Sequence, residues 1–260
     1  MLAVLYANGE GVERDVALAM RFSCESEGAP AEISGRLEHL QQIQTGKTPG
    51  HFGYCDDVTS GFMQGFCAAV DAELSEQTRL DEVQRLTSFW PRAQQTAFAR
   101  VQKVEKAYAD AHGGGEINIA GTGRAMFEIE ATQKLRDGFY DAVRGLEKRL
   151  PDATDESEEK AANSDLNDLY RKVIALAETK KSEYGAVQPD GIRLAERAWL
   201  VYRDAWIKFA AIRYPSVPPH VWISLLTNDR VGVLKDTLCE VDWDRAKCDD
   251  EVYEGPHPLL

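Results

Sequence analysis

The chain has 260 residues, of which 43% are hydrophobic and 28% charged, as is typical of one large globular domain or two smaller ones. Its formal net charge of −13 argues against a nucleic-acid surface, which needs clustered lysine and arginine side chains. No run of about eighteen apolar residues exists, so no membrane-spanning helix is expected. The first residues lack the basic region of a signal peptide, which predicts either a cytoplasmic chain or a leader upstream.

The first residues predict two short helices joined at a glycine turn. Gly9 and Gly11 separate two apolar segments, and glycine allows the tight reversal. The pattern resembles the Sel-type helical repeats, relatives of the tetratricopeptide repeats, and a single such repeat cannot bury its own apolar face. It must therefore end a longer array or pack onto the next segment of the chain. A helix over 31–44 and a linker over 45–50 complete a first domain, residues 1–48. The residues that match the repeat are Leu2, Leu5, Tyr6, Gly9, Gly11, Val12, Asp15 and Ala19.

Helical periodicity continues through the rest of the chain. Apolar residues recur every three or four positions over 126–150, 166–177 and 192–213, and no stretch alternates with the period of a strand. The segment 192–213 predicts a buried central helix, with Leu194 and Val201 widening its apolar stripe. We therefore predict an all-α fold, a helical bundle with a short N-terminal helical-repeat segment. The aromatic residues of the central stripe are Trp199, Tyr202, Trp206 and Phe209.

The acidic string 152–159 comes after Pro151 and gives the best interior boundary, so further domains are predicted at 49–151 and 152–260. The five histidines are scattered, with no metalloprotease motif, and the cysteine spacing matches no common zinc site. Acidic residues are too numerous for a chance pair to indicate glycoside cleavage. We therefore expect no catalytic residues, no metal site and no cofactor.

The C-terminal region resembles the LprI-like family of bacterial lysozyme-inhibitor and related exported domains over residues 55–240. The most specific element is W-x-x-Y-R-D, present at 199–204. Two family cysteines are replaced by Trp206 and Trp222, and about ninety residues are inserted before the L-N-x-x-Y element. Thr122 and Arg124 echo Thr227 and Arg230, which raises the alternative that residues 49–151 are a diverged duplicate. The matching residues are Cys55, Cys67, Asp71, Leu74, Leu166, Asn167, Tyr170, Leu194, Trp199, Tyr202, Arg203, Asp204, Thr227, Arg230 and Leu234.

The resemblance implies a disulfide between Cys55 and Cys67, in an exported chain where such bonds persist. It also implies that Trp206 and Trp222 touch, because they stand where the family has a crosslink. Cys239 and Cys248 form a weaker candidate pair, and Cys24 is left unassigned.

Among the family positions, Arg203 and Asp204 are predicted to form a structural ion pair among the aromatic residues. A charge buried there needs compensation. We therefore expect Arg230 to reach Asp204 or a nearby carbonyl group.

The function implied is that of a non-catalytic protein-binding module of the bacterial cell envelope, periplasmic or otherwise exported. Its expected activity is inhibition of, or immunity to, a basic lysozyme-type peptidoglycan hydrolase, for which the acidic surface suits a basic partner. The expected contact is a loop that enters a glycan cleft, either 112–121 with Glu116 at its tip or the proline-rich 214–220. The alternative is a structural or scaffolding protein whose partners are unrelated to peptidoglycan.

Overall fold

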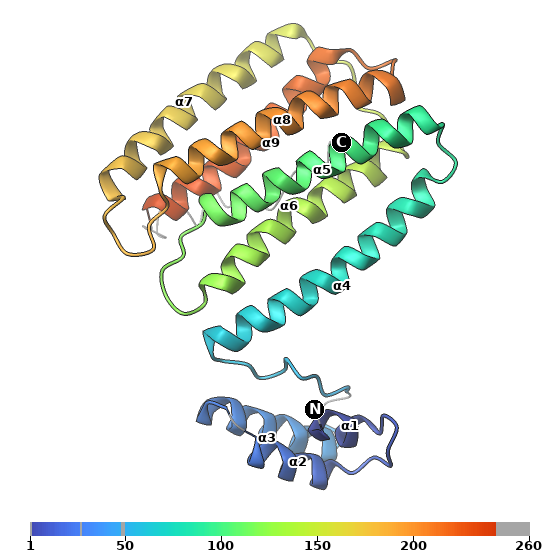
Figure 1. The fold of residues 1–260 in the computed structure, drawn as a ribbon, viewed down its shortest axis with the longest axis vertical. Helices are drawn as coiled ribbons and strands as arrows, with labels where there is room; N and C mark the ends of the chain where they lie inside the picture. Colours follow the sequence, from blue (N-terminus) through green and yellow to red (C-terminus); the bar gives the residue numbers. More distant parts are fainter. Residues whose placement is uncertain (1, 27, 48–49, 243–260) are drawn as a thin grey trace. The chain divides into compact units, whose positions relative to one another are not determined.

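The computed structural model describes residues 2–26, 28–47 and 50–242, and within these ranges it contains helices and no strand (Figure 1). The predicted all-α fold is confirmed. No helix in these ranges is long and apolar enough to cross a membrane. The helices are α1 (Leu2–Asn8), α2 (Val16–Glu25), α3 (Pro30–Gln44), α4 (Gly61–Thr87), α5 (Arg92–Gly115), α6 (Arg124–Leu146), α7 (Glu156–Lys180), α8 (Pro189–Arg213) and α9 (Pro219–Asp242).

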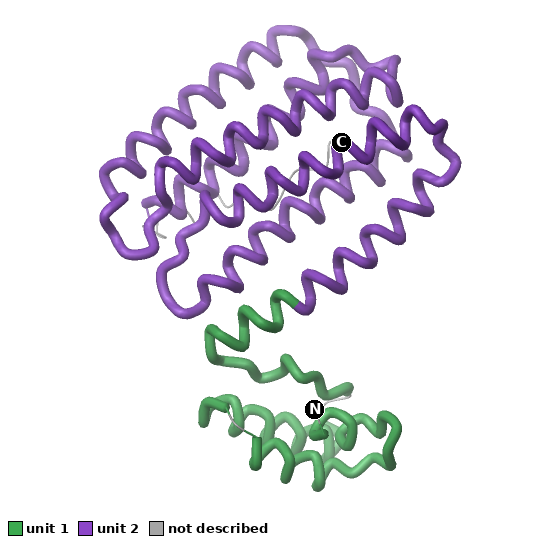
Figure 2. Tube along the Cα trace, viewed as in Figure 1, with its two compact units in different colours: residues 1–69 green, residues 70–260 purple. Residues whose placement is uncertain are grey.

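The chain forms two compact units, which meet inside α4 (Figure 2). Unit 1 comprises residues 1–69 and unit 2 residues 70–260. The helical-repeat segment therefore shares a unit with the cysteine pair that comes after it in the chain. The helices on either side of the acidic string 152–159 both lie in unit 2.

In unit 1 the N-terminal helix pair packs onto the next segment of the chain. Gly9 and Gly11 have φ values of 74° and 72°, which glycine adopts without strain, and Asp15 caps α2 by accepting from the Leu18 N–H. The Asn8 side chain exchanges two hydrogen bonds with the backbone of Phe52, at 3.0 and 2.8 Å. The repeat thus buries its apolar face within its own unit. The core residues of this unit are Ala7, Ala19, Leu40, Ile43 and Phe52.

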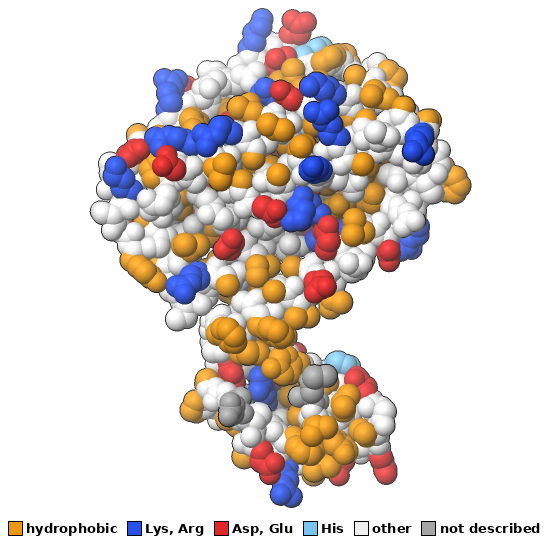
Figure 3. All heavy atoms as spheres, in the orientation of Figure 1, with side chains coloured by type: hydrophobic (Ala, Val, Ile, Leu, Met, Phe, Trp, Pro, Cys, Tyr) orange, Lys and Arg blue, Asp and Glu red, His pale blue; other side chains and the backbone are white. Residues whose placement is uncertain are grey.

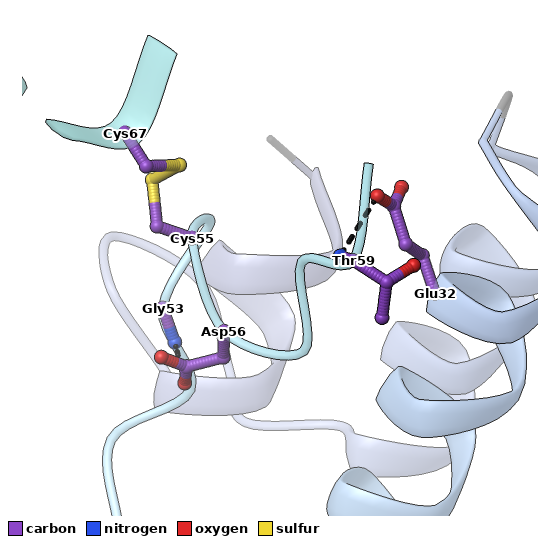
Figure 4. Close-up of a disulfide and its surroundings, with 6 residues drawn as sticks. All are labelled: Glu32, Gly53, Cys55, Asp56, Thr59 and Cys67. Carbon is purple, nitrogen blue, oxygen red and sulfur yellow. Dashed lines mark hydrogen bonds between the residues drawn. A yellow bond between two sulfur atoms is a disulfide. The ribbon is translucent and has the colours of Figure 1, made fainter. Parts of the chain in front are cut away.

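The predicted disulfide joins Cys55 to Cys67, with the Cα atoms 5.7 Å apart (Figure 4). Beside it, Glu32 of α3 accepts hydrogen bonds from the backbone N–H groups of Thr59 and Ser60, at 3.0 and 2.7 Å. The bond from Ser60 is the main reason why the pKa of Glu32 falls to about 2. The start of α4 is therefore held by a covalent bond and a buried carboxylate.

The other three cysteines are Cys24, Cys239 and Cys248. The candidate pair of Cys239 with Cys248 depends on residue 248, which lies outside the described residues. Cys24 is a free, exposed thiol.

Removing the disulfide is expected to destabilise unit 1 by about 3 kcal/mol, because the open chain regains the entropy of a short loop. The variant is Cys55→Ser with Cys67→Ser, and its control is Cys24→Ser. All five tryptophans lie beyond residue 89, so their fluorescence reports on unit 2 while circular dichroism reports on both units. Urea unfolding of the double variant should show an early dichroism change with no matching fluorescence change. Identical curves for variant and control would contradict the prediction.

Unit 2 is a bundle of long helices that lie side by side (Figure 1). Helix α5 packs most extensively on α8, and α7 packs on α9. The aromatic stripe of α8 is buried, as predicted, and the rings of Trp206 and Trp222 meet edge to face with their centroids 6.3 Å apart. The predicted Trp206–Trp222 contact is therefore confirmed.

Two predictions about this bundle are wrong. Leu194 and Val201 are 54% and 56% exposed, because α5, α7 and α9 leave one face of α8 uncovered. The glycines at 113–115 do not open a loop but belong to the last turn of α5. A Cβ atom at Gly113 would lie 2.1 Å from Thr132 Oγ1, and one at Gly115 would lie 2.9 Å from the carbonyl oxygen of Gly191. These glycines let α5 approach α6 and α8 closely.

Candidate functional site

One group of buried polar residues in unit 2 surrounds Arg230, on α9. Its guanidinium donates to both carboxylate oxygens of Glu116, at 2.8 and 2.6 Å, and its Nε–H donates to Glu196 at 2.9 Å. The Tyr108 hydroxyl accepts from it at 3.2 Å, and the Tyr108 ring lies 5.5 Å from its centre. His112 donates from Nδ1 to Glu116 at 2.8 Å. We call these five residues the Arg230 cluster.

The Arg230 cluster is largely buried, with only Glu196 partly exposed, and its charges are paired. Burial alone would raise the pKa of Glu116, but the Arg230 guanidinium and the hydrogen bond from His112 outweigh it and hold the pKa at about 2. Burial raises the pKa of Tyr108, which therefore keeps its proton. Glu116 and Arg230 expose 0% and 1% of their surface. The cluster thus has a structural role, tying the C-terminal end of α5 to the middle of α9.

This geometry corrects three predictions. Glu116 is not at a loop tip and cannot contact a partner, because α5 continues through the glycines and turns it inward. Arg230 does not reach Asp204, whose side chain is 60% exposed and lies 3.5 Å from Arg203. Arg203 is only partly buried, with its guanidinium 5.1 Å from the centre of the Trp199 ring. The Arg203–Asp204 pair therefore lies at the edge of the core and not among its aromatic residues.

The other family positions are divided between core and surface. Leu166 and Thr227 are buried, and Tyr170 is partly buried. Asn167 is exposed and donates only to the Asn163 carbonyl of its own helix. Asp71 and Leu74, the latter 62% exposed, also face outward. The motif residues therefore do not converge on one surface site.

A second buried network joins α4, α5 and α6. Arg136 donates to Glu105 at 2.7 Å and to both oxygens of Glu76, at 2.6 and 2.7 Å, and Arg79 donates to Glu76 at 3.2 Å. The Glu105 side chain bonds Arg136 through Oε2 alone. Its Oε1 is buried and has no hydrogen-bond partner among the described residues. The network thus leaves one buried carboxylate oxygen uncompensated.

Glu105 also lines a cavity. A cavity of about 40 Å³ lies where α5, α6, α8 and α9 meet. Among its lining residues only Leu135 of α6 and Asp229 of α9 are partly exposed, so the cavity reaches solvent between those helices. Sequence reasoning missed this site, although a signal existed: Glu105 falls between Val101 and Tyr108 on the buried face of α5. The lining residues with polar or aromatic side chains are Glu105, Tyr108, Phe139, Trp199, Tyr202, Asp229 and Arg230.

The two carboxyl groups in this wall hold protons more tightly than usual. Burial raises the pKa of Glu105 to about 8 against the opposing effect of Arg136, and the nearby Glu76 adds to the rise. Burial also raises the pKa of Asp229 to about 8, but Asp229 retains some exposure, so we assign Glu105 the larger energetic share. Burial likewise raises the pKa of Tyr202, with Glu105 and Asp229 contributing. The surroundings of this cavity therefore favour neutral carboxyl groups.

A carboxyl group with a raised folded-state pKa stabilises the fold below its unfolded pKa of roughly 4, and this stability is lost as the pH rises through about 8. We expect the free energy of unfolding to fall by about 1–3 kcal/mol between about pH 5 and pH 8. Glu105→Gln should reduce that slope, and Asp165→Asn, which changes an exposed carboxyl group on α7, should not. Denaturant unfolding between about pH 5 and pH 8 measures how the free energy of unfolding changes with pH. The same pH dependence in both variants would contradict the prediction. The charged or titratable groups near Glu105 are Glu76, Arg79, Asp110, Arg136, Tyr140, Tyr202, Asp229 and Arg230.

The loops at one end of unit 2 are tied together into a rigid surface, at the upper side in Figure 1. Glu147, after α6, accepts from Tyr214 at 2.9 Å and from Arg213 at 2.6 Å, both at the end of α8. The Arg213 guanidinium lies 4.5 Å from the centre of the Trp90 ring, in the loop before α5. His220 donates from Nε2 to the carbonyl oxygen of Thr154 at 2.9 Å. We call this surface, formed by residues 88–91, 147–158 and 214–220, the loop end.

The loop end presents apolar side chains and more acidic than basic ones: four exposed carboxylates against Lys148 and Arg149. Phe89 is 93% exposed, whereas Trp90, Tyr214 and Val217 are buried and hold the loops in place. Elsewhere, the face of unit 2 drawn in Figure 3 mixes acidic, basic and hydrophobic side chains. The loop end, with its apolar and mainly acidic exposed side chains, suits a basic protein partner. The further exposed residues of the loop end are Ser88, Pro91, Lys148, Arg149, Asp152, Ala153, Asp155, Glu156, Ser157, Glu158, Pro215, Ser216, Pro218 and Pro219.

No group of three or more histidine, cysteine, aspartate or glutamate side chains within the described ranges is placed to hold a metal ion. Comparisons with family models, with curated proteins and with solved structures found no match. The geometry of the chain itself therefore carries the functional argument.

Proposed function

We propose that this protein is a non-catalytic protein-binding module of the bacterial cell envelope, and that the loop end is its contact surface. The observation that carries the proposal is the rigid, exposed proline loop beside the acidic start of α7. A loop whose backbone is already held in place loses little conformational entropy when it binds. The Cys55–Cys67 disulfide supports an exported location, since such bonds persist in oxidising compartments.

The proposed partner is a basic lysozyme-type peptidoglycan hydrolase. The protein would inhibit this hydrolase or confer immunity to it. The net charge of −13 favours encounter with a basic protein, and attraction of this kind weakens as salt screens it. Residues 214–220 replace Glu116 as the proposed cleft-entering contact, because Glu116 is buried. Membership of the LprI-like family is part of the same proposal.

The folded protein should slow the attack of a basic muramidase on cell walls without altering peptidoglycan itself. Reversing one charge at the loop end, with Glu158→Lys, should weaken inhibition roughly fivefold at low salt and less at moderate salt. Its matched control is Glu183→Lys, which makes the same charge change in the exposed loop at the other end of α7. Assays with several muramidases at two salt concentrations measure both effects.

Equal inhibition by the two variants would place the contact elsewhere on the molecule. Failure to bind any muramidase at low ionic strength would reject the inhibitor proposal and favour the scaffolding alternative. Release of soluble sugar fragments by the protein alone would contradict the non-catalytic assignment.

A further inference from the structure

The cavity between α5, α6, α8 and α9 combines acidic groups with aromatic walls. Glu105, itself 2% exposed, lines the cavity, and its Oε1 has no hydrogen-bond partner among the described residues. Asp229 lines the same cavity, and no basic side chain in the described ranges forms an ion pair with it. Burying such oxygens is costly unless a donor or a positive charge satisfies them. A cationic hydrogen-bond donor in the cavity would therefore satisfy these carboxyl groups.

The basic side chains nearby are already paired with carboxylates. Arg230, the basic residue in the wall, is shared between Glu116 and Glu196, and Arg136 is shared between Glu105 and Glu76. Each guanidinium thus faces two carboxylates. An anionic ligand would meet no free cation in the wall, whereas a cationic ligand would complete the pairing.

The remaining wall selects an organic cation over a metal ion. The described residues provide no cluster of three ligating side chains, and most of the lining is aromatic or aliphatic. Rings of tryptophan and tyrosine attract ammonium groups through their faces, and here Trp199, Tyr108 and Tyr202 line the space. The volume of about 40 Å³ corresponds to roughly three water molecules and excludes a bulky quaternary ammonium.

We propose that this cavity binds a primary alkylammonium group, held by Glu105 Oε1 and the Asp229 carboxylate. The alkyl stem leaves between α6 and α9, against the apolar side chains of Leu135, Leu226 and Val233. Proton linkage supports the site: both carboxyl groups have raised pKa values, so an incoming cation should displace their protons. This inference does not depend on the loop end. Its failure would leave the proposed muramidase inhibition untouched, and the reverse is also true.

The test titrates the full chain with propylammonium chloride at constant ionic strength up to about 100 mM, followed by thermal unfolding and calorimetry. Propylammonium should raise the melting temperature, whereas tetramethylammonium, 1-propanol and potassium ion should not. Calorimetry in two buffers with different ionisation enthalpies should detect proton release on binding near pH 7. Nα-acetyl-lysine amide serves as a separate arm that distinguishes a lysine side chain from a free amine as the source of the ammonium group.

Glu105→Gln and Asp229→Asn should each weaken propylammonium binding about tenfold or more, since each removes one charged acceptor. Asp165→Asn, which changes an exposed carboxyl group on α7, is the control and should bind like the unchanged protein. Circular dichroism checks that each variant folds. If Glu105→Gln does not fold, Asp229→Asn provides the test, because Asp229 is partly exposed and its substitution disturbs the core less. Equal binding by Asp229→Asn and the control, equal effects of tetramethylammonium, or no response to propylammonium would overturn the proposal.

Discussion

Arg230→Met is expected to destabilise unit 2 by about 3–5 kcal/mol, because it leaves the Glu116 carboxylate buried without its bidentate partner. His112 alone cannot replace a guanidinium that donates to both oxygens. Denaturant unfolding followed by tryptophan fluorescence measures the change. The loss should be smaller near pH 5, because Glu116 without Arg230 would take up a proton more readily.

The double variant Arg230→Met with Glu116→Met separates the two causes of this loss. Removing both charges leaves apolar groups of similar length, a change that is often much less harmful than breaking a buried pair. The double variant should therefore be more stable than Arg230→Met alone. An Arg230→Met protein that unfolds at the same denaturant concentration as the unchanged protein would show that the Arg230 cluster contributes little.

Trp206→Ala is expected to cost about 3–5 kcal/mol, as other large-to-small changes in cores do. Trp206 is 0% exposed, and its ring packs against Phe139, Phe209 and Trp222 with centroid distances of 5.7, 5.8 and 6.3 Å. Its indole N–H has no hydrogen-bond partner among the described residues, so the residue stabilises the core through packing.

Two further variants make this test specific. Trp206→Phe should cost clearly less than Trp206→Ala, since it keeps most of the apolar contact and loses no hydrogen bond. Phe89→Ala removes a 93% exposed ring and should change stability by less than about 0.5 kcal/mol. Circular dichroism melts of the three variants give the order, and a Trp206→Ala protein as stable as Phe89→Ala would disprove the packing argument.

The helices and the aromatic core could be predicted from the sequence because they rest on local spacing. Trp199, Tyr202, Trp206 and Phe209 recur at helical intervals, and such a stripe predicts burial wherever the helix lies. The same reasoning failed for Leu194, because local spacing does not tell how many neighbouring helices will cover a given face.

The Arg230 cluster could not be predicted in this way. Glu116 and Arg230 are 114 positions apart, and nothing local indicates that they meet. The glycines before Glu116 were interpreted as a loop signal, whereas their use here is close packing of α5 against α6 and α8. Extending the face of α5 through Tyr108 and His112 would have reached Glu116 and predicted its burial.

The separation between Glu116 and Arg230 also sets an order of events during synthesis on the ribosome. The α5 helix and its carboxylate emerge 114 residues before the guanidinium that neutralises them. Until α9 is released, closing the other helices around Glu116 would bury an unpaired charge. Closing α5, α6 and α8 around Glu116 is therefore disfavoured while α9 is still being made, because the carboxyl group would have to be buried as an unpaired charge or take up a proton. In that interval a chaperone that shields amphipathic helices is most useful to this protein.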